Sequence, residues 1–411
     1  MSDTDINIKE SFKEANNDSG NDTGNDTGKD FPLTESRVLK VVRPFMAENI
    51  SLNEDAYIDD LDRVMTTDML IEGTHFDWQY STPYDVGWKA ASVNLSDLNG
   101  MLARPLQLTV GLGIPKHTLQ KDLHDFYQGL SDACNAAMKP WRQEASSFIV
   151  GGDTVRAPQW SVSITAIGQR VNVPKLWGLR SSAQVGHRVI LSGEPGLSAT
   201  GLWALQNGLD GYEAAKTQHR RPALRSDAMK NLLELSSLLD EHKQPKNDDA
   251  PSSVDSVNSV KNTLALMDTS DGLADAALKI AGASSNASAA AGSGFGAHSI
   301  SIVLNERQLP CHPDVHDVKS ANNPRDMMLY GGEDFGLLAC IPSEYPVPEG
   351  FVEIGTVVER KADSFGSSDF SGLAYLQVTN ESESGEESVK YIPLSAEKTF
   401  QHFGDVSGER V

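Results

Sequence analysis

The chain has 411 residues, and its 35 Lys and Arg stand against 57 Asp and Glu, which gives a formal net charge of −22 at pH 7. No apolar run approaches the ~18–20 residues of a membrane-spanning helix, residues 1–30 are too acidic for a targeting segment, and no Lys/Arg stripe suits a nucleic-acid-binding protein. The three cysteines have no CxxC spacing. We therefore expect a cytoplasmic protein without disulfides, with neither nucleic acid nor membrane as a partner.

Four polar segments flank or interrupt the patterned parts of the chain. Residues 1–35 contain the repeat NDSG-NDTG-NDTG, which offers no apolar side chain to bury, so we expect a disordered acidic tail there. Surface insertions are expected near 241–260, 282–297 and 380–388, where Asp, Asn, Ser, Gly, Ala or Glu dominate.

The first patterned region, residues 36–173, alternates short apolar runs with one helical pattern. Strands are expected at 63–67, 106–112, 147–150 and 161–167. A helix is expected between the second and third strands, because Leu119, Leu123, Phe126, Leu130, Ala133 and Ala137 recur at spacings of four and three. Pro174 and Gly178 then interrupt regular structure, and we place the domain boundary there.

The second region, residues 179–403, repeats the alternation. Strands are expected at 187–191, 263–267, 335–341 and 352–357, and helices at 197–206 and 272–280. Strands that alternate with helices are typical of α/β proteins. The sequence therefore predicts a two-domain α/β (or α+β) protein.

Six aspartates are attached to these apolar runs. Carboxylates at strand ends in α/β proteins tend to line the crevice where ligands bind, and if several converge their charge must be neutralised. Few Lys, Arg, His or Cys lie beside them, so an oxygen-rich cluster favours a hard cation, Mg²⁺ first. Thr66, Thr67 and Ser270 add neutral oxygens. The six acids are Asp55, Asp68, Asp97, Asp153, Asp268 and Asp271.

Glycine pairs precede two acidic positions, in GGD at 151–153 and GGED at 331–334. A backbone without side chains lets main-chain N–H groups approach a polyphosphate, and the helix expected after DTSDG at 268–272 favours an anion at its start. The sequence contains no GxxxxGK[ST] motif. The pattern predicts a nucleotide-phosphate site built from metals and glycines instead of a P-loop.

Six motifs, in one order along residues 36–403, resemble the thiamine-monophosphate kinase family of the aminoimidazole ribonucleotide synthetase-like superfamily. They are TTDMLIEGTHF (66–76), VNLSDLNGMLARP (93–105), GGDT (151–154), RSSAQVG (180–186), DTSDGL (268–273) and GGEDF (331–335). The resemblance implies that residues 36–173 form a metal- and ATP-binding domain, which pairs between two subunits into a dimeric β-barrel flanked by helices. Residues 179–403 would form a C-terminal α/β domain, and the working form would be a homodimer. The implied reaction is transfer of the ATP γ-phosphoryl group to thiamine monophosphate, giving thiamine diphosphate and ADP, with several Mg²⁺ ions.

The resemblance also assigns roles position by position. Metal-ligand positions are matched by Asp55, Thr66, Thr67, Asp68, Asp97, Asp153, Asp268 and Asp271, ATP-contact positions by Gly152, Arg180 and Ser270, and thiamine-monophosphate positions by His75 and Glu333. Two positions depart from the family pattern: Glu54 replaces an aspartate, and Glu397 replaces a substrate-contacting aromatic residue. On the residues alone, Arg180 fits an ATP contact and a linker arginine paired with an acid equally well.

The predicted chemistry needs no general acid or base. A phosphate monoester is mostly a dianion at neutral pH, because its second pKa lies near ~6, and the obstacle is to bring it against a triphosphate. Asp68, Asp97 and Asp153 are therefore predicted as a metal scaffold for direct in-line transfer without a phosphoenzyme. Two alternatives stay open: another ATP-dependent synthetase of the superfamily, and a non-catalytic Mg²⁺–nucleotide-binding protein.

Overall fold

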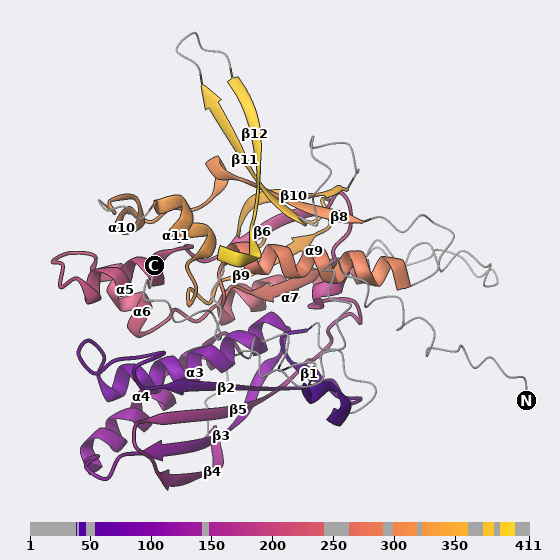
Figure 1. The fold of residues 1–411 in the computed structure, drawn as a ribbon. Helices are drawn as coiled ribbons and strands as arrows, with labels where there is room; N and C mark the ends of the chain where they lie inside the picture. The colour runs from indigo at the N-terminus through magenta and orange to yellow at the C-terminus, as the bar shows by residue number, and fades with distance from the viewer. Residues whose placement is uncertain are drawn as a thin grey trace, which may run out of the picture.

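The computed structural model describes residues 38, 41–46, 54–141, 148–241, 263–290, 299–318, 323–360, 373–381 and 387–398. Their strands form one five-stranded sheet and one seven-stranded sheet. Figure 1 shows the first sheet in the lower half of the molecule and the second in the upper half, with α3 (Pro83–Gly100) lying between them. The predicted mixed α/β fold is confirmed. No helix of the described residues has the length and apolar character that a membrane crossing needs.

The five-stranded sheet has the order β1-β2-β5-β3-β4. Its strands are β1 (Tyr57–Ile58), β2 (Arg63–Ile71), β3 (Arg104–Ile114), β4 (Ile149–Arg156) and β5 (Ser161–Gln169). Along β2 and β5 nearly every second side chain is buried, as expected for strands covered on one face. That face packs against α3 and α4 (Gln120–Met138) in one hydrophobic core. Met65 and Met69 lie on the other face of β2 and are 47% and 52% exposed.

Two glycines let α3 and α4 cross closely. An added Cβ at Gly87 would lie 1.9 Å from the Phe126 carbonyl oxygen, and one at Gly129 would lie 2.0 Å from the Tyr84 carbonyl oxygen. Thr82 begins α3 with a capping box, in which its side chain accepts from the Asp85 backbone N–H and the Asp85 side chain accepts from the Thr82 N–H. Most of α3 is buried, because it packs on the first sheet and on the C-terminal half.

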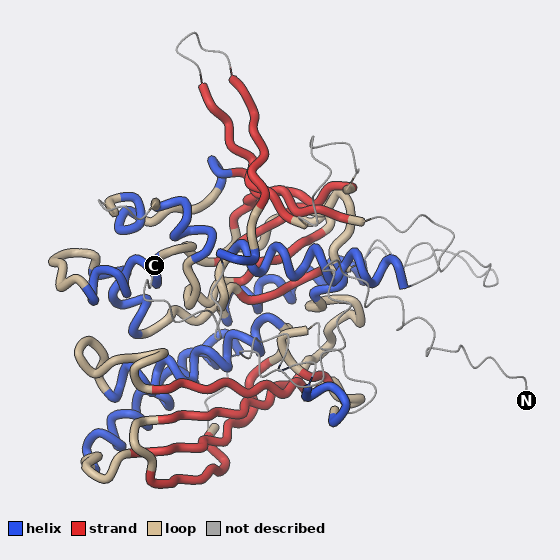
Figure 2. The backbone as a smooth tube through the Cα atoms, in the orientation of Figure 1, coloured by secondary structure: helices blue, strands red, loops and turns tan. Residues whose placement is uncertain are grey.

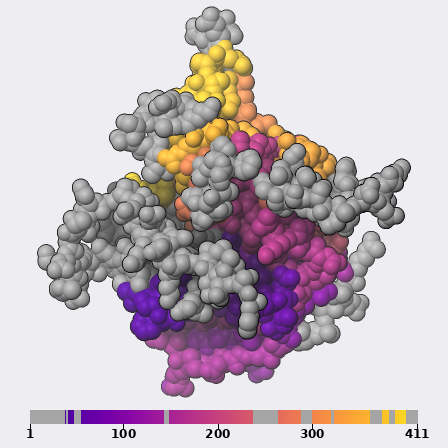
Figure 3. Space-filling model, turned by 90° about the vertical axis from the view of Figure 1, so that its right-hand side faces the viewer, coloured from indigo at the N-terminus to yellow at the C-terminus, as the bar shows by residue number. Residues whose placement is uncertain are grey.

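The seven-stranded sheet has the order β12-β11-β8-β10-β6-β9-β7. Its strands are β6 (Arg188–Ser192), β7 (Ala265–Asp268), β8 (Ile300–Asn305), β9 (Leu337–Ile341), β10 (Val352–Glu359), β11 (Ala374–Glu381) and β12 (Glu387–Pro393). All neighbours are antiparallel except β8 and β11. The β11–β12 strands project from the body of the molecule, at the top of Figures 1 and 3.

Helices cover both faces of this sheet. Val189 and Leu191 of β6 share a core with α9 (Leu273–Ala290), whereas Ile190 shares a core with α7 (Ser226–Glu241). The alternation of side chains along β6 thus assigns the two helices to opposite faces. Figure 2 shows these helices beside the strands. The remaining helices are α5 (Leu197–Gln206), α6 (Glu213–Arg220), α10 (Pro313–His316) and α11 (Pro324–Tyr330), with short 3₁₀ turns η1 (Arg43–Phe45), η2 (Lys139–Trp141), η3 (Arg180–Ser182), η4 (Glu306–Gln308) and η5 (Ala396–Lys398).

Two sequence expectations about strand ends are wrong. Asp68 lies within β2, because the alternation continues through Leu70 and Ile71. Asp153 lies within β4, because Thr154, Val155 and Arg156 continue to pair with β3. Only Asp268 ends its strand as expected.

The expected tail and insertions are described only in part. The helix expected at 272–280 extends to Ala290, so the first half of the insertion expected at 282–297 is helical, in keeping with its Ala and Ser content. The 1–35 tail, most of 241–260, and residues 382–386 of the 380–388 insertion lie outside the described residues. The single chain forms no closed barrel among its described strands, so the dimeric barrel stays a prediction, as do the two domain boundaries.

Candidate metal and phosphate site

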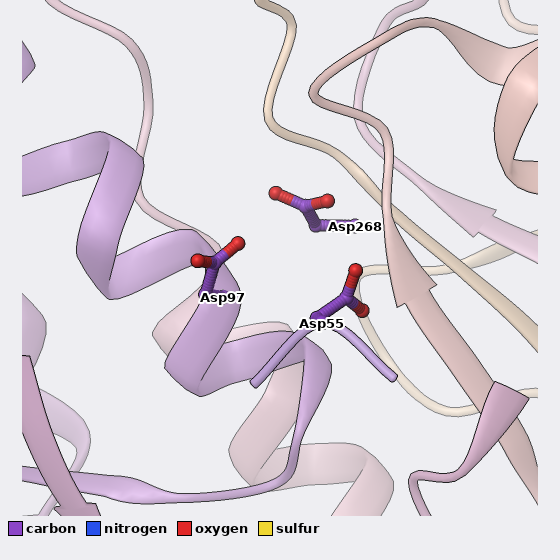
Figure 4. A group of neighbouring side chains, drawn as sticks. All are labelled: Asp55, Asp97 and Asp268. Atoms are coloured by element: carbon purple, nitrogen blue, oxygen red, sulfur yellow. The ribbon is translucent and has the colours of Figure 1, made fainter. Parts of the chain in front are cut away.

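Three aspartates from distant parts of the chain meet between the two halves of the molecule. Asp55 precedes β1, Asp97 lies in the last turn of α3, and Asp268 ends β7. One carboxylate oxygen from each lies within 4.8 Å of the others. Figure 4 shows the three carboxylates turned toward a common space. The predicted convergence of these three acids is therefore present in the fold.

Hydroxyl groups orient the carboxylates of this cluster. Thr66 Oγ1 donates to Asp97 Oδ2 from the inward face of β2. Ser96 Oγ donates to Asp268 Oδ2 at 2.7 Å, and Ser270 Oγ donates to Asp268 Oδ1 at 3.0 Å. Gly100 ends α3 beside them, where an added Cβ would lie 3.1 Å from Asp55 Oδ2 and 3.3 Å from the Asp268 nitrogen. The cluster is thus held from both halves of the chain.

The cluster carries more negative charge than its surroundings balance. Burial, together with the nearby carboxylates of Asp68 and Asp268, raises the pKa of Asp97 well above its usual range. Burial also raises the pKa of Asp268. Asp55 Oδ2 is buried and has no hydrogen-bond partner. An all-oxygen donor set with an unpaired buried oxygen fits a hard divalent cation such as Mg²⁺.

Arg180 supplies the positive charge closest to the cluster. Its guanidinium pairs with Asp55, and its backbone N–H donates to Glu54 Oε2 at 2.8 Å. The side chains of Arg180 and Asp55 are only 13% and 3% exposed. Arg180 is therefore paired with an acid, as one of its two sequence interpretations predicts, and that acid belongs to the cluster. Its contact with ATP stays a prediction. Glu54, one of the two departures from the family pattern, accepts this hydrogen bond at the start of η3.

Asp271 borders the cluster and is partly neutralised. Its Oδ2 lies 3.0 Å from Lys279 Nζ, which also pairs with Asp275 at 2.8 Å. Burial raises the pKa of Asp268 and the Asp271 charge raises it further, whereas the hydrogen bonds from Ser96 and Ser270 lower it. Asp68 is likewise close to the cluster, as its effect on the pKa of Asp97 indicates.

Three predicted residues lie apart from the cluster in the single chain. Thr67 points to the opposite face of β2, where its Oγ1 lies 2.5 Å from Thr165 Oγ1. Gly152 and Asp153 lie on β4, and β5 and β3 separate that strand from β2. At about 4.8 Å between neighbouring strands, β4 lies roughly 14 Å from β2. The structure therefore separates the GGD motif from the acidic cluster of its own chain.

His75 and Glu333 lie together at the other end of α3. His75 follows β2, and its Nδ1 accepts from the Ile71 N–H at 3.1 Å. Glu333 precedes β9, and its Oε1 lies 2.9 Å from Lys89 Nζ. Lys89 Nζ also donates to the His75 carbonyl oxygen at 3.0 Å. His219 Nδ1 lies 3.4 Å from Glu333 Oε2. The two residues predicted to hold the acceptor are thus linked through Lys89.

The sequence analysis did not identify Lys89 or His219 as partners of Glu333. One signal for Lys89 was available: it is the single charged residue in the otherwise uncharged run at 86–96. A lone lysine in a helix that is buried on most sides requires a specific partner. His219 carried no such signal, because its burial depends on how α6 packs.

The GGED loop joins the two ends of the site. The Glu333 N–H donates to the Ser270 carbonyl oxygen at 2.7 Å, and an added Cβ at Gly332 would lie 2.9 Å from the same oxygen. The next residue, Asp334, accepts from the Gly196 N–H at 2.5 Å and from the Ser198 N–H at 2.7 Å. These contacts occupy the N–H groups at the start of α5, so the SGEPG segment (192–196) forms a turn that packs on the GGED loop.

Comparison with known proteins agrees with this geometry. The model of the family "AIR synthase related protein, N-terminal domain" matches residues 53–170. The thiamine-monophosphate kinase of Synechococcus elongatus is 29% identical over 350 residues, which cover 83% of this chain and 86% of that protein. The thiamine-monophosphate kinase of Mycobacterium tuberculosis is 30% identical over 304 residues, 73% of this chain and 75% of that protein. A solved structure of AaThiL complexed with AMPPCP and TMP matches with a TM-score of 0.64 at 24% identity, covering 92% of this chain and all of that one.

Residues 53–170 have the AIR synthase related N-terminal domain. Among proteins with this domain, the chain belongs to the thiamine-monophosphate kinase family. The resemblance seen in the sequence, and the prediction that the chain is an enzyme of this family, are confirmed.

Proposed function

We propose that this chain transfers the γ-phosphoryl group of ATP to thiamine monophosphate, giving thiamine diphosphate and ADP. The observation that carries the proposal is the meeting of Asp55, Asp97 and Asp268 in one buried cluster of a chain of this family. A solved protein of similar fold is complexed with AMPPCP and TMP, which supports both substrates.

We propose that the cluster holds Mg²⁺, with Asp55, Asp97 and Asp268 as ligands and with Asp68, Asp271, Thr66, Thr67 and Asp153 completing the set of positions that the family pattern assigns. When bound, several Mg²⁺ ions would supply the charge neutralisation that lets two phosphate-bearing anions meet. Thr66 and Ser96 contribute by fixing the orientation of Asp97 and Asp268. These hydrogen bonds leave the carboxylates pre-oriented, so that less reorganisation is needed on binding.

The remaining residues would position the two substrates for direct in-line transfer. Gly152, Arg180 and Ser270 would contact ATP, and His75 and Glu333 would hold thiamine monophosphate. No residue needs to act as a general base, because the acceptor phosphate is already mostly a dianion at neutral pH. Positioning and charge neutralisation then supply nearly all of the catalysis.

We also propose that the protein works as a cytoplasmic homodimer whose N-terminal domains (36–173) pair into a shared barrel, each followed by a C-terminal domain (179–403). Met65, Met69, Val150 and Val155 are about half exposed on the five-stranded sheet, and β4 is an edge strand with almost every residue exposed. A second copy would cover this surface and could bring Gly152 and Asp153 to the cluster that lies out of their reach in one chain.

An assay with thiamine monophosphate and ATP tests the proposed function. We expect ADP and thiamine diphosphate in equal amounts, and no turnover when Mg²⁺ is chelated. Asp210→Asn, at an exposed position away from the cluster, is a control that should keep full activity. Binding of Mg²⁺–ATP without thiamine diphosphate formation would instead favour the non-catalytic alternative.

A further inference from the structure

Lys89 is a buried lysine that contacts both residues expected to hold the acceptor. Its side chain is only 3% exposed. Its Nζ lies 2.9 Å from Glu333 Oε1 and donates to the His75 carbonyl oxygen at 3.0 Å. A buried ammonium group is very costly unless it is paired and hydrogen-bonded. The two contacts therefore define where Lys89 must lie, and equally where Glu333 and the His75 backbone must lie.

Helix α3 makes this contact part of a rigid frame. Lys89 and Ser96 are seven residues apart, so they lie on the same side of the helix. Ser96 Oγ donates to Asp268 at the end of β7, and Lys89 pairs with Glu333 just before β9. Strands β7 and β9 are neighbours, with Asp268 opposite Leu337. One face of α3 thus contacts both the acidic cluster, through Ser96, and the acceptor end, through Lys89, at the β7–β9 edge of the seven-stranded sheet.

Glu333 needs such a restraint. It has a φ of +65°, in the left-handed region that residues with a side chain rarely occupy. Its other close partner, His219, does not supply a charge, because burial and the Lys89 charge lower the pKa of His219 to about 3. Arg220 donates to the Tyr80 carbonyl oxygen and Arg221 pairs with Asp85 at 3.2 Å. Among the described groups facing Glu333, Lys89 therefore makes the largest contribution to balancing its charge, and His75 makes a smaller one.

We propose that Lys89 is a positioning residue for the acceptor substrate: it fixes the Glu333 carboxylate and the turn that carries His75, so that both face thiamine monophosphate in one geometry. This inference rests on the proposed function of the site. Lys89 acts through Glu333 and His75, and needs no contact with the substrate itself. The inference predicts a selective effect on the acceptor, since ATP is expected at the other end of α3.

The test compares Lys89→Met, Lys89→Arg and the control Lys230→Met, a half-buried surface lysine that pairs with Glu234 on α7. For each variant, kcat and the separate KM values for thiamine monophosphate and ATP are measured, together with the thermal midpoint. We expect K89M to raise the KM for thiamine monophosphate at least about tenfold, with the KM for ATP within about twofold of the wild type. K89R keeps the charge and should restore part of the loss, and K230M should match the wild type.

Each outcome decides the inference. Equal KM values for thiamine monophosphate in the wild type and K89M, with only a lower thermal midpoint, would overturn it. If K89M does not fold, K89R decides: an equal rise in both KM values overturns the inference, and a rise for thiamine monophosphate alone supports it. A wild type that makes no thiamine diphosphate would overturn the proposed function, and with it this inference. Turnover by the wild type with an unaltered K89M would overturn the Lys89 inference alone.

Discussion

The two ends of the site balance their buried carboxylates in opposite ways. At the Lys89 end, burial alone would raise the pKa of Glu333, but the adjacent Lys89 outweighs it and the pKa lies below its usual range. At the Asp97 end, burial and the carboxylates of Asp68 and Asp268 push the pKa of Asp97 well above its usual range. Among the residues that the structure describes, the guanidinium of Arg180 is the one that pairs with these three converging aspartates.

The Lys89–Glu333 end is thus balanced by charges within the protein, whereas the acidic cluster has a surplus of negative charge. The Lys89–Glu333 pair is neutral overall within the protein itself, so it can fix the geometry of an incoming molecule without further ions. We propose that positive charge from solution completes the acidic cluster, because buried like charges repel one another. A pocket of this kind is suited to receive metal together with a phosphate-bearing ligand.

The largest effect is expected for Asp97→Asn. This change keeps the shape of the side chain but removes a charge from the cluster, and we expect kcat to fall by about 10³-fold or more. In metal-free buffer the same variant should have a higher thermal midpoint than the wild type, because a repelled buried charge has gone. Calorimetry and the turnover assay measure the two effects. If D97N loses activity because it is unfolded, the prediction of a lower kcat together with a higher thermal midpoint is contradicted.

Asp153→Asn tests the part of the site that lies away from the cluster. We expect a loss of activity similar to that of D97N, since a homodimer would use Asp153 of one copy beside Asp97 of the other. Co-expression of D97N and D153N chains should then restore about a quarter of the wild-type activity, because half of randomly formed dimers are mixed and each mixed dimer has one intact site. Differently tagged chains allow the mixed dimers to be purified. Mixed dimers without activity would rule out sharing across the interface.

Glu333→Gln should act on stability in the opposite direction from D97N. It leaves the Lys89 ammonium buried without its counter-charge, and breaking a buried pair from one side typically costs 3–5 kcal/mol. Because the Glu333 side chain is 30% exposed, we expect a loss of about 2–3 kcal/mol in the free energy of unfolding. Denaturant titration measures this loss. Glu234→Gln, which breaks the exposed pair with Lys230, should change it by less than about 0.5 kcal/mol.

A smaller effect concerns His187, which is buried away from the site. Burial lowers its pKa to about 4, whereas an unfolded histidine has a pKa near ~6.5. A lowered histidine pKa means that its contribution to stability is fully present above pH 6.5 and is lost as the pH falls toward 4. At pH 5 the loss is on the order of 2 kcal/mol.

Comparing His187→Asn with the wild type isolates the contribution of His187 to the pH dependence of the free energy of unfolding. Between pH 7.5 and pH 5, the difference in unfolding free energy between the two proteins should shift by about 2 kcal/mol in favour of the variant. A wild type and H187N with parallel pH profiles would contradict the assignment.

The sequence predicted that six acids converge, and three of them, Asp55, Asp97 and Asp268, meet in one cluster. Asp153, which follows an apolar run in the same way, lies apart from them in the single chain. The extent of the strands was harder to predict. Asp68 and Asp153 seemed to end strands, yet both lie within them. Along β2 the burial of alternate side chains continues past Asp68, and β4 continues to pair with β3 past Asp153. Residues within one strand also divide between its faces, which is why Thr66 meets Asp97 while Thr67 points away.

Contacts between distant segments were beyond the reach of local patterns. The pairing of Arg180 with Asp55 joins residues that are 125 positions apart, and the pairing of Lys89 with Glu333 depends on how α3 packs against the second sheet. The helical spacing that predicts the α4 residues says nothing about such contacts. The separation of Gly152 and Asp153 from the cluster follows from strand order, which a single sequence does not state.

The most direct test is the effect of Mg²⁺ on thermal unfolding of the wild type, D97N and E333Q at a fixed ATP concentration. If the acidic cluster receives the cation, Mg²⁺ should raise the midpoint of the wild type and of E333Q by similar amounts and leave that of D97N nearly unchanged. An equal rise in all three proteins would contradict the claim that Asp55, Asp97 and Asp268 form the cation-binding pocket.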